Sequence, residues 1–213
     1  MSTPAPGPVQ PAFVPSFGGY AGQPGAIVGV GFWPRAVARI IDTLGHYFVV
    51  FFASFLFSLL LAIAALITHQ PFQVLAAKLH HLGFMGFLFV LMGSIGYHTV
   101  CESVHGSTLG KLALGMVVIQ EDGTPCRFKA ALIRSLAYFI DSLFFGLIGY
   151  FAMQKTPQMQ RHGDDWAHTI VCKRSAAPPE TLRSGARFVL ALMLGAMTDA
   201  ALVMILLLLK LVF

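Results

Sequence analysis

The stretch that decides the fold is Gly31–Ile67, GFWPRAVARIIDTLGHYFVVFFASFLFSLLLAIAALI. From Thr43 onward it carries no formal charge, and as a helix it is long enough to cross a hydrocarbon core of about 30 Å. Its first turns carry four polar side chains on one helix face, at i, i+4, i+7 and i+11: Arg35, Arg39, Asp42 and His46. The stretch therefore predicts a transmembrane helix with a charged beginning. In the alternative interpretation, the arginines only extend toward the headgroups and Asp42 pairs locally with one of them.

The composition is that of an integral membrane protein. Hydrophobic residues make up 56% of the 213 residues and charged residues only 11%, less than half of their usual share in soluble domains. The net charge of +5 is spread over loops without a basic run interleaved with aromatics, which suits a lipid bilayer as partner and argues against nucleic acid. The three cysteines have no metal-ligand spacing and predict no disulfide framework.

Two further apolar runs predict transmembrane helices. Leu82–Cys101 has no formal charge. Phe188–Leu209 carries a single acid, Asp199, and belongs to an additional C-terminal helix over residues 186–213. At the other end of the chain, residues 1–30 are rich in proline and glycine and carry no charge, which predicts a disordered tail that a protein partner could bind.

The run Ser135–Gln154 has Asp141 near its middle, and it either spans the membrane or re-enters as two short helices on one side. Basic residues concentrate on the cytoplasmic side of a membrane protein. If the run re-enters, 12 of the 14 lysines and arginines share the side of the N-terminus, whereas a crossing run divides them equally. The count favours the re-entrant hairpin and a cytoplasmic N-terminus. A thiol at Lys78 should then be labelled from outside, and one at Arg161 or Arg183 should not.

Two short segments predict β-strands on the same side of the membrane. Leu114–Ile119 is β-branched and apolar and is followed by a turn signal, EDGT, and Thr169–Lys173 is a second strand candidate. Strands around Val118 and Ile170 should pair there. The predicted fold is an all-α membrane protein, a small helical bundle of three full spans plus a re-entrant helical hairpin, or of four spans, with a small β-strand lobe at the cytoplasmic face.

No cofactor is predicted. His98, Glu102 and His105 share a helix face with a spacing that could hold a divalent metal, but ordinary hydrogen bonds are the more frequent role of such a face. The GSTLGK segment lacks the first glycine and the Ser or Thr of a Walker loop.

Four stretches of the sequence resemble the RDD family of bacterial membrane proteins, which is named for an arginine and two aspartates. They are GFWPRAVARIID, ESVHGSTLGKLALGMVVIQEDGTP, RSLAYFID and QRHGDDWAHTIV. The matching residues of the two membrane stretches are Arg35, Asp42, Arg134 and Asp141. Those of the two polar stretches, expected at the cytoplasmic face, are Glu102, Gly106, Thr108, Gly110, Lys111, Gly115, Gln160, Arg161, Asp164, Ala167 and Thr169.

The resemblance implies a multi-pass protein of the bacterial inner membrane with an RDD-like membrane domain over residues 31–174. The resemblance therefore implies a fold but no established activity, although the family is commonly thought to transport a solute. Nothing about the C-terminal helix or Asp199 follows from it.

Two functions compete. An acid at the middle of a bilayer costs on the order of 2.5–3.5 kcal/mol, so Asp42, Asp141 and Asp199 favour a small transporter or an ion- or proton-coupled carrier, which would need a homo-oligomer to build a pore wall. In the alternative, the protein is a membrane scaffold or assembly factor and its Arg and Asp residues are structural buried pairs. An enzyme is not expected, since the sequence has no catalytic triad, zinc signature or phosphate loop.

The cheapest arrangement of charges in lipid is mutual pairing. We therefore expect Arg35, Asp42 and Asp141 to form one polar cluster, with Asp141 bound to the Arg35 guanidinium. Lys111 and Asp164 should share one face of the lobe.

Overall fold

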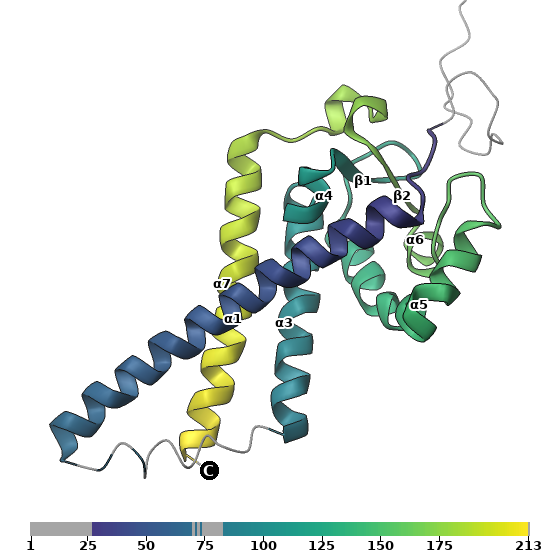
Figure 1. Ribbon diagram of the computed structural model, residues 1–213. Coiled ribbons are helices and arrows are strands. Elements are labelled where there is room, and N and C mark those ends of the chain that lie inside the picture. Colours follow the sequence, from purple (N-terminus) through teal and green to yellow (C-terminus); the bar gives the residue numbers. More distant parts are fainter. Residues whose placement is uncertain (1–26, 70, 72, 74–82, 213) are drawn as a thin grey trace, which may run out of the picture.

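The computed structural model describes residues 27–69, 71, 73 and 83–212, and these are mostly helical (Figure 1). Four helices are long and apolar enough to cross a membrane: α1 (Phe32–Thr68), α3 (Gly83–Val104), α5 (Phe128–Met153) and α7 (Gly185–Val212). Between them lie the short elements α4 (Leu109–Ala113), β1 (Met116–Gln120), α6 (His162–Trp166), β2 (Thr169–Lys173) and the 3₁₀ turns η1 (Arg174–Ala176) and η2 (Pro179–Thr181). The multi-helix fold predicted from the hydropathy pattern is confirmed.

The predicted pairing of the two strands is also confirmed. β1 and β2 form a two-stranded antiparallel sheet in which Val118 lies opposite Val171 and Ile119 opposite Ile170. The strands are buried on both faces, because side chains alternate between two apolar clusters. We call α4, β1, α6 and β2 the polar lobe. The lobe lies where α1 begins, α3 ends and α7 begins (Figure 1).

The chain before α1 also contacts this sheet. Gly29 forms a bridge with Cys172, and the Val30 amide donates to the Val171 carbonyl over 2.8 Å. The last residues of the predicted tail are therefore paired with β2. The rest of the tail prediction concerns residues 1–26, which lie outside the described residues. The same holds for Lys78, where labelling from outside was predicted.

Helix α5 is broken in its middle. Leu143–Gly146 have non-helical backbone angles, and Phe144 and Phe145 adopt positive φ values of 50° and 60°. A Cβ added to Gly149 would lie 3.0 Å from the Asp141 carbonyl oxygen, although the two residues would be about 12 Å apart along a straight helix. The chain therefore folds back after Ser142. Length and composition alone place α5 among the candidate spans, but its backbone is that of a helical hairpin.

The strand pairing leads to the same conclusion. β1 precedes α5 in sequence and β2 follows it, yet the two strands are hydrogen-bonded partners. A helix that crossed the membrane would place its two flanking strands on opposite sides. The structure thus supports the re-entrant alternative over the fourth span.

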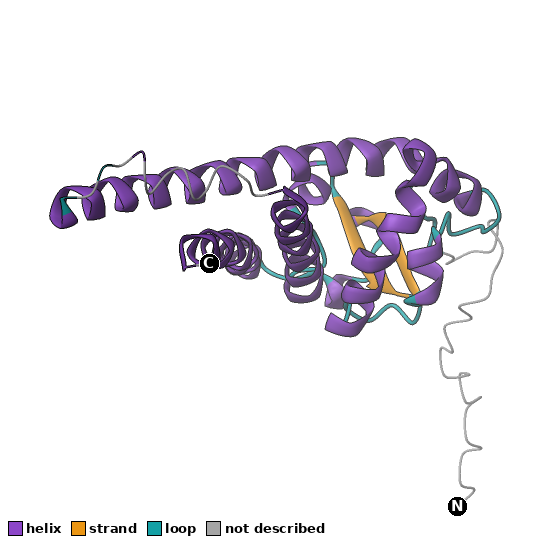
Figure 2. Cartoon of the chain, turned by 90° about the horizontal axis from the view of Figure 1, so that it is seen from below, coloured by secondary structure: helices purple, strands orange, loops and turns teal. Residues whose placement is uncertain are grey.

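Close packing of α7 against α3 depends on glycines. The two helices run alongside each other, and they are seen nearly end-on in Figure 2. A Cβ on Gly96 would lie 2.8 Å from Thr198 Cγ2, one on Gly195 would lie 2.9 Å from Tyr97 Cδ2, and one on Gly93 would overlap Asp199 Oδ1. Small residues of this kind let helices approach each other in a membrane, where lipid tails compete with apolar side chains.

Helix α1 is the longest element. Its 37 residues correspond to about 55 Å, more than a bilayer core requires. Its first turns contact the polar lobe, and farther along it many large apolar side chains such as Phe51, Phe55 and Leu66 are exposed. Such a surface is expected to face lipid.

The hairpin can be tested by labelling single cysteines placed at Lys129 and Gln154, exposed residues at the two ends of α5, in a variant whose native cysteines are replaced by serine. In oriented vesicles, a membrane-impermeant maleimide should react with both thiols from the same side. Reaction from opposite sides would mean that α5 crosses the membrane.

The α3–α7 contact predicts that Gly93→Ala lowers the free energy of unfolding by about 1–3 kcal/mol, because the new methyl group displaces the buried Asp199. Gly185→Ala is the matched control, since nothing lies within 4 Å of its added Cβ. Denaturation in mixed micelles measures both. Equal effects of the two substitutions would show that the glycine contact is not needed.

Candidate functional site: a charged cavity beside a buried ion-pair network

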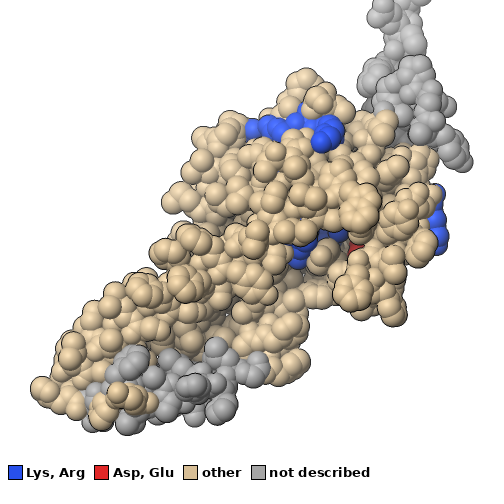
Figure 3. Space-filling model, in the orientation of Figure 1, with Lys and Arg blue, Asp and Glu red and all other residues tan. Residues whose placement is uncertain are grey.

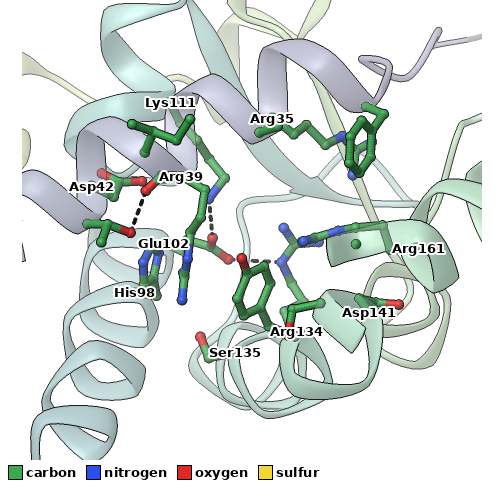
Figure 4. A pocket seen from close by; sticks show the side chains of 18 of the residues that line it. Arg35, Arg39, Asp42, His98, Glu102, Lys111, Arg134, Ser135, Asp141 and Arg161 are labelled. Atoms are coloured by element: carbon green, nitrogen blue, oxygen red, sulfur yellow. Dashed lines mark hydrogen bonds and ion pairs between the residues drawn. The ribbon is translucent and has the colours of Figure 1, made fainter. Parts of the chain in front are cut away.

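Five buried charged side chains form one ion-pair network. The Asp164 carboxylate accepts hydrogen bonds from Arg35 Nη1 and Arg134 Nη1. Glu102 accepts from Arg134 Nε over 2.9 Å and from Lys111 Nζ over 2.7 Å. Arg134 thus joins the two carboxylates, and Figure 4 shows Glu102 between Lys111 and Arg134. The network joins α1, α3, α4, α5 and α6.

Asp164 has the most cationic surroundings of these residues. It lies in the first turn of α6, accepts from the Arg161 amide over 3.1 Å, and is fully buried. Burial by itself would raise the pKa of the Asp164 carboxyl, but the Arg134 and Arg35 guanidiniums outweigh this effect and hold that pKa well below its usual range. Asp164 is therefore a permanent anion at the centre of the fold.

Asp42 binds α4 rather than an arginine. Its oxygens accept from Thr108 Oγ1 over 2.6 Å, from the Gly110 amide over 2.7 Å and from Tyr97 Oη over 3.2 Å. Gly110 has to be glycine, because a Cβ would overlap the Ala38 carbonyl of α1. The GSTLGK segment therefore attaches α4 to α1.

Asp141 binds the beginning of α6. It lies 3.0 Å from His162 Nδ1 and accepts from the His162 and Gly163 amides, each over 3.3 Å. Gly163 lies close to α5, where its added Cβ would be 2.9 Å from Ala137 Cβ. The side chain thus connects the hairpin to the polar lobe.

The expected contacts within the cluster of Arg35, Asp42 and Asp141 were wrong. Arg35 pairs with Asp164 of α6, and each of the two aspartates binds backbone amides of a neighbouring segment. An amide that the fold places at hydrogen-bond distance satisfies a buried carboxylate without the cost of burying another charge. Lys111 and Asp164, which were expected to share one face of the lobe, are linked through Glu102 and Arg134.

The three residues do share the wall of one cavity of about 490 Å³ between α1, α3 and α5. Figure 3 shows basic and acidic atoms within a hollow on one face of the molecule. The charged and polar residues of its wall are Arg35, Arg39, Asp42, Thr43, Tyr47, His98, Glu102, Lys111, Arg134, Ser135, Tyr138, Asp141, Ser142 and Arg161. Its apolar wall includes Phe32, Leu44, Phe145 and Met153.

Arg39 is the charged residue of this cavity wall that is not among the residues matched to the family motifs. Its guanidinium carbon lies 3.9 Å from the centre of the Tyr138 ring, and one nitrogen donates to Ser94 Oγ over 3.4 Å. It forms no ion pair with a carboxylate of the described residues. The i, i+4 spacing in the sequence placed Arg39 on the polar face of α1. No sequence pattern indicated that Tyr138 would contact it.

Asp199, the acid of α7, lies away from the cavity. Its Oδ2 is 2.5 Å from His46 Nδ1, and both side chains are buried among α1, α3 and α7. His46 lies on the predicted polar stripe, but the stripe did not indicate which residue it would meet. The pair connects the C-terminal helix to α1.

The remaining predicted residues hold the polar lobe together. Thr169 Oγ1 accepts from Arg134 Nη1 over 2.8 Å. Gln160 Nε2 donates to Glu121 Oε1 over 2.6 Å and to the Thr169 carbonyl over 3.1 Å. Gly106 adopts a φ of +86°, which glycine favours, just after α3 ends.

The weak metal candidate formed by His98, Glu102 and His105 is not assembled. Both oxygens of Glu102 face cations, and His105 packs against Phe188 with ring centres 5.0 Å apart. Within residues 27–69, 71, 73 and 83–212, no group of three His, Cys, Asp or Glu side chains is arranged to hold a metal ion.

A family comparison covers the part of the chain that builds the cavity. The sequence model of the RDD family matches residues 30–169. The chain belongs to the RDD family. No match was found among curated proteins or among solved structures. The RDD match includes the residues of the cavity and of the whole ion-pair network, and it ends before α7. In the His46–Asp199 contact, His46 therefore lies inside the match and Asp199 outside it.

The network predicts that Asp164→Asn lowers the free energy of unfolding by about 3–5 kcal/mol, because it leaves the buried Arg35 and Arg134 guanidiniums without their shared anion. Asp165→Asn is the control, since Asp165 is exposed and should change stability little. Unfolding in mixed micelles gives both values. A loss for Asp164→Asn no larger than that for the control would contradict the central role of Asp164.

Proposed function

We propose that this RDD protein is a membrane carrier, not an enzyme, in which the cavity binds a small charged solute. The observation that carries the proposal is the cavity itself, about 490 Å³ in size and lined by charged side chains of helices that are otherwise apolar. This volume falls within the range of sites for small molecules. Charged residues within membrane segments usually mark a pathway for a solute or an ion.

The charges around the cavity divide into two groups. The charges of the ion-pair network pair with one another, so a structural role accounts for these pairs. Arg39 also lines the cavity but contacts only a hydroxyl and an aromatic ring among the described residues. A buried cation that forms no direct ion pair is costly. A bound anionic solute could pair with the Arg39 guanidinium and so stabilise it.

The broken helix supports the same proposal. Phe145 and Gly146 of the α5 turn line the cavity, and Phe144 and Phe145 hold positive φ values that are rare for bulky residues. Interrupted helices next to a polar site are a common feature of transporters. We assign the α5 turn as the element whose movement admits the solute, with the polar lobe on the cytoplasmic side as the positive-inside rule favours.

A flux assay tests the proposal. Purified protein in liposomes should move protons or a test ion under an imposed pH gradient, and Arg39→Gln should reduce this flux at least tenfold without changing the amount of folded protein. Arg187→Gln, at an exposed arginine of α7, should leave the flux unchanged. Flux that is the same in empty liposomes, or in both variants, would refute the carrier.

A scaffold is the second candidate, because the network joins the polar lobe to three of the long helices. A protein with this role would show no flux and would co-purify with a protein partner. A carrier of this size should instead form a homo-oligomer, which cross-linking in the membrane would detect.

A further inference from the structure

We propose that the cavity binds an amphiphilic anion, with a phosphate-type group between Arg39 and Arg161 and an apolar part along the wall of α1 and α5. The inference rests on the proposed function in that the anion is the solute of the same site. Four observations carry it: the charge balance of the wall, the position of two guanidiniums over one ring, unpartnered donors and the apolar side of the cavity.

The wall has more positive than negative groups. Five basic side chains line the cavity against three carboxylates, and Asp164 of the network adds a fourth. The carboxylates are also occupied. Both oxygens of Glu102 face cations, and Asp42 and Asp141 accept hydrogen bonds from α4 and α6. In Figure 4, Asp42 and Asp141 lie at opposite ends of the cavity and Arg39 lies between them.

Two guanidiniums from different elements approach the same ring. Arg39 Cζ lies 3.9 Å and Arg161 Cζ 5.7 Å from the centre of Tyr138. The acid that Arg161 approaches is Asp164 at 3.6 Å, and Asp164 already accepts from Arg35 and Arg134. Like charges near one ring repel each other unless an anion joins them. A phosphate oxygen bound by both arginines would remove this repulsion.

Donors on the cavity's residues are also left without partners. Arg134 Nη2 and Arg161 Nε are buried and donate to no acceptor in the described residues. A buried donor of this kind is unusual, because leaving it unpaired is costly. Both belong to side chains that line the cavity, so a small adjustment of the side chains would let an anion accept from them.

Part of the cavity wall is apolar and includes side chains that are also exposed on the surface. Phe32 and Leu44 of α1 and Phe145 of α5 line the cavity, and Leu44 and Phe145 are also exposed on the molecular surface. A ligand with an anionic head and an apolar tail fits this division. The same chemistry could come from a lipid headgroup or from a soluble phosphate, and the experiment separates these two sources.

Binding is measured as thermal stabilisation of the full-length protein in a neutral detergent. The probes are inorganic phosphate, a short-chain phosphatidylglycerol and, as the zwitterionic control, a short-chain phosphatidylcholine. Phosphatidylglycerol should stabilise the protein more strongly than phosphatidylcholine at equal concentration. Stabilisation by phosphate as well would identify the anionic group as sufficient, and its absence would identify a lipid headgroup as the ligand; both results support the anion site.

The variants locate the site. Arg39→Gln and Arg161→Gln should each weaken phosphatidylglycerol binding at least tenfold, and Arg39→Lys should weaken it less because the charge remains. Arg187→Gln is the control for attraction to the surface. Equal weakening by Arg187→Gln, or equal stabilisation by the two lipids, would overturn the inference. If Arg39→Gln does not fold, phosphatidylglycerol binding by Arg161→Gln and Arg39→Lys tests the inference instead.

The result is separable from that of the flux assay. Selective anion binding that depends on Arg39, without any flux, would refute the carrier and retain the anion site. Flux that depends on Arg39, without selective binding of either anionic probe, would retain the carrier and overturn the anion site.

Discussion

The structure depends on one buried carboxylate, Asp164, shared by two arginines that are distant in sequence. Arg35 comes from the beginning of α1 and Arg134 from the first half of α5, 129 and 30 residues away from Asp164. None of the three charges is tolerable alone in an apolar interior. Each therefore requires the other two, which holds the first helix, the hairpin and the polar lobe in one arrangement.

This constraint explains why the buried charged residues of the chain serve different roles. Arg35 and Arg134 neutralise Asp164, whereas Asp42 and Asp141 bind backbone amides and attach α4 and α6 to the helices. With these contacts made, the cavity wall retains a guanidinium, Arg39, that forms no ion pair with a carboxylate of the described residues. Arg39 lies within the RDD match, between Arg35 and Asp42 on the polar face of α1.

The C-terminal helix joins the bundle by other means. Glycines bring α7 against α3, and the His46–Asp199 contact pairs two polar side chains that would each be costly alone in lipid. Because α7 lies outside the RDD match, this contact is an addition to the RDD portion of the chain. It places the polar end of α1 in contact with both the lobe and the additional helix.

The sequence by itself determined the long apolar helices, the polar face of α1 and the pairing of β1 with β2. These follow from local periodicity and from the bilayer, which imposes the same requirements along the whole chain. The basic residues favoured the hairpin, since membrane orientation depends on loop charge. The sequence left open whether the run spans or re-enters. The non-helical backbone at Leu143–Gly146 forms the turn of a hairpin.

The partners of the charges were decided only by the tertiary structure. Asp42 could have paired with an arginine, but Gly110 brings an amide close enough to bind it, and Arg35 instead reaches Asp164 in α6. The contacts of Arg39 with Tyr138 and of His46 with Asp199 likewise join residues on different helices. Sequence spacing places side chains on one face of one helix. Which groups meet across helices depends on how the backbones dock, because amides and charged side chains compete for the same carboxylates.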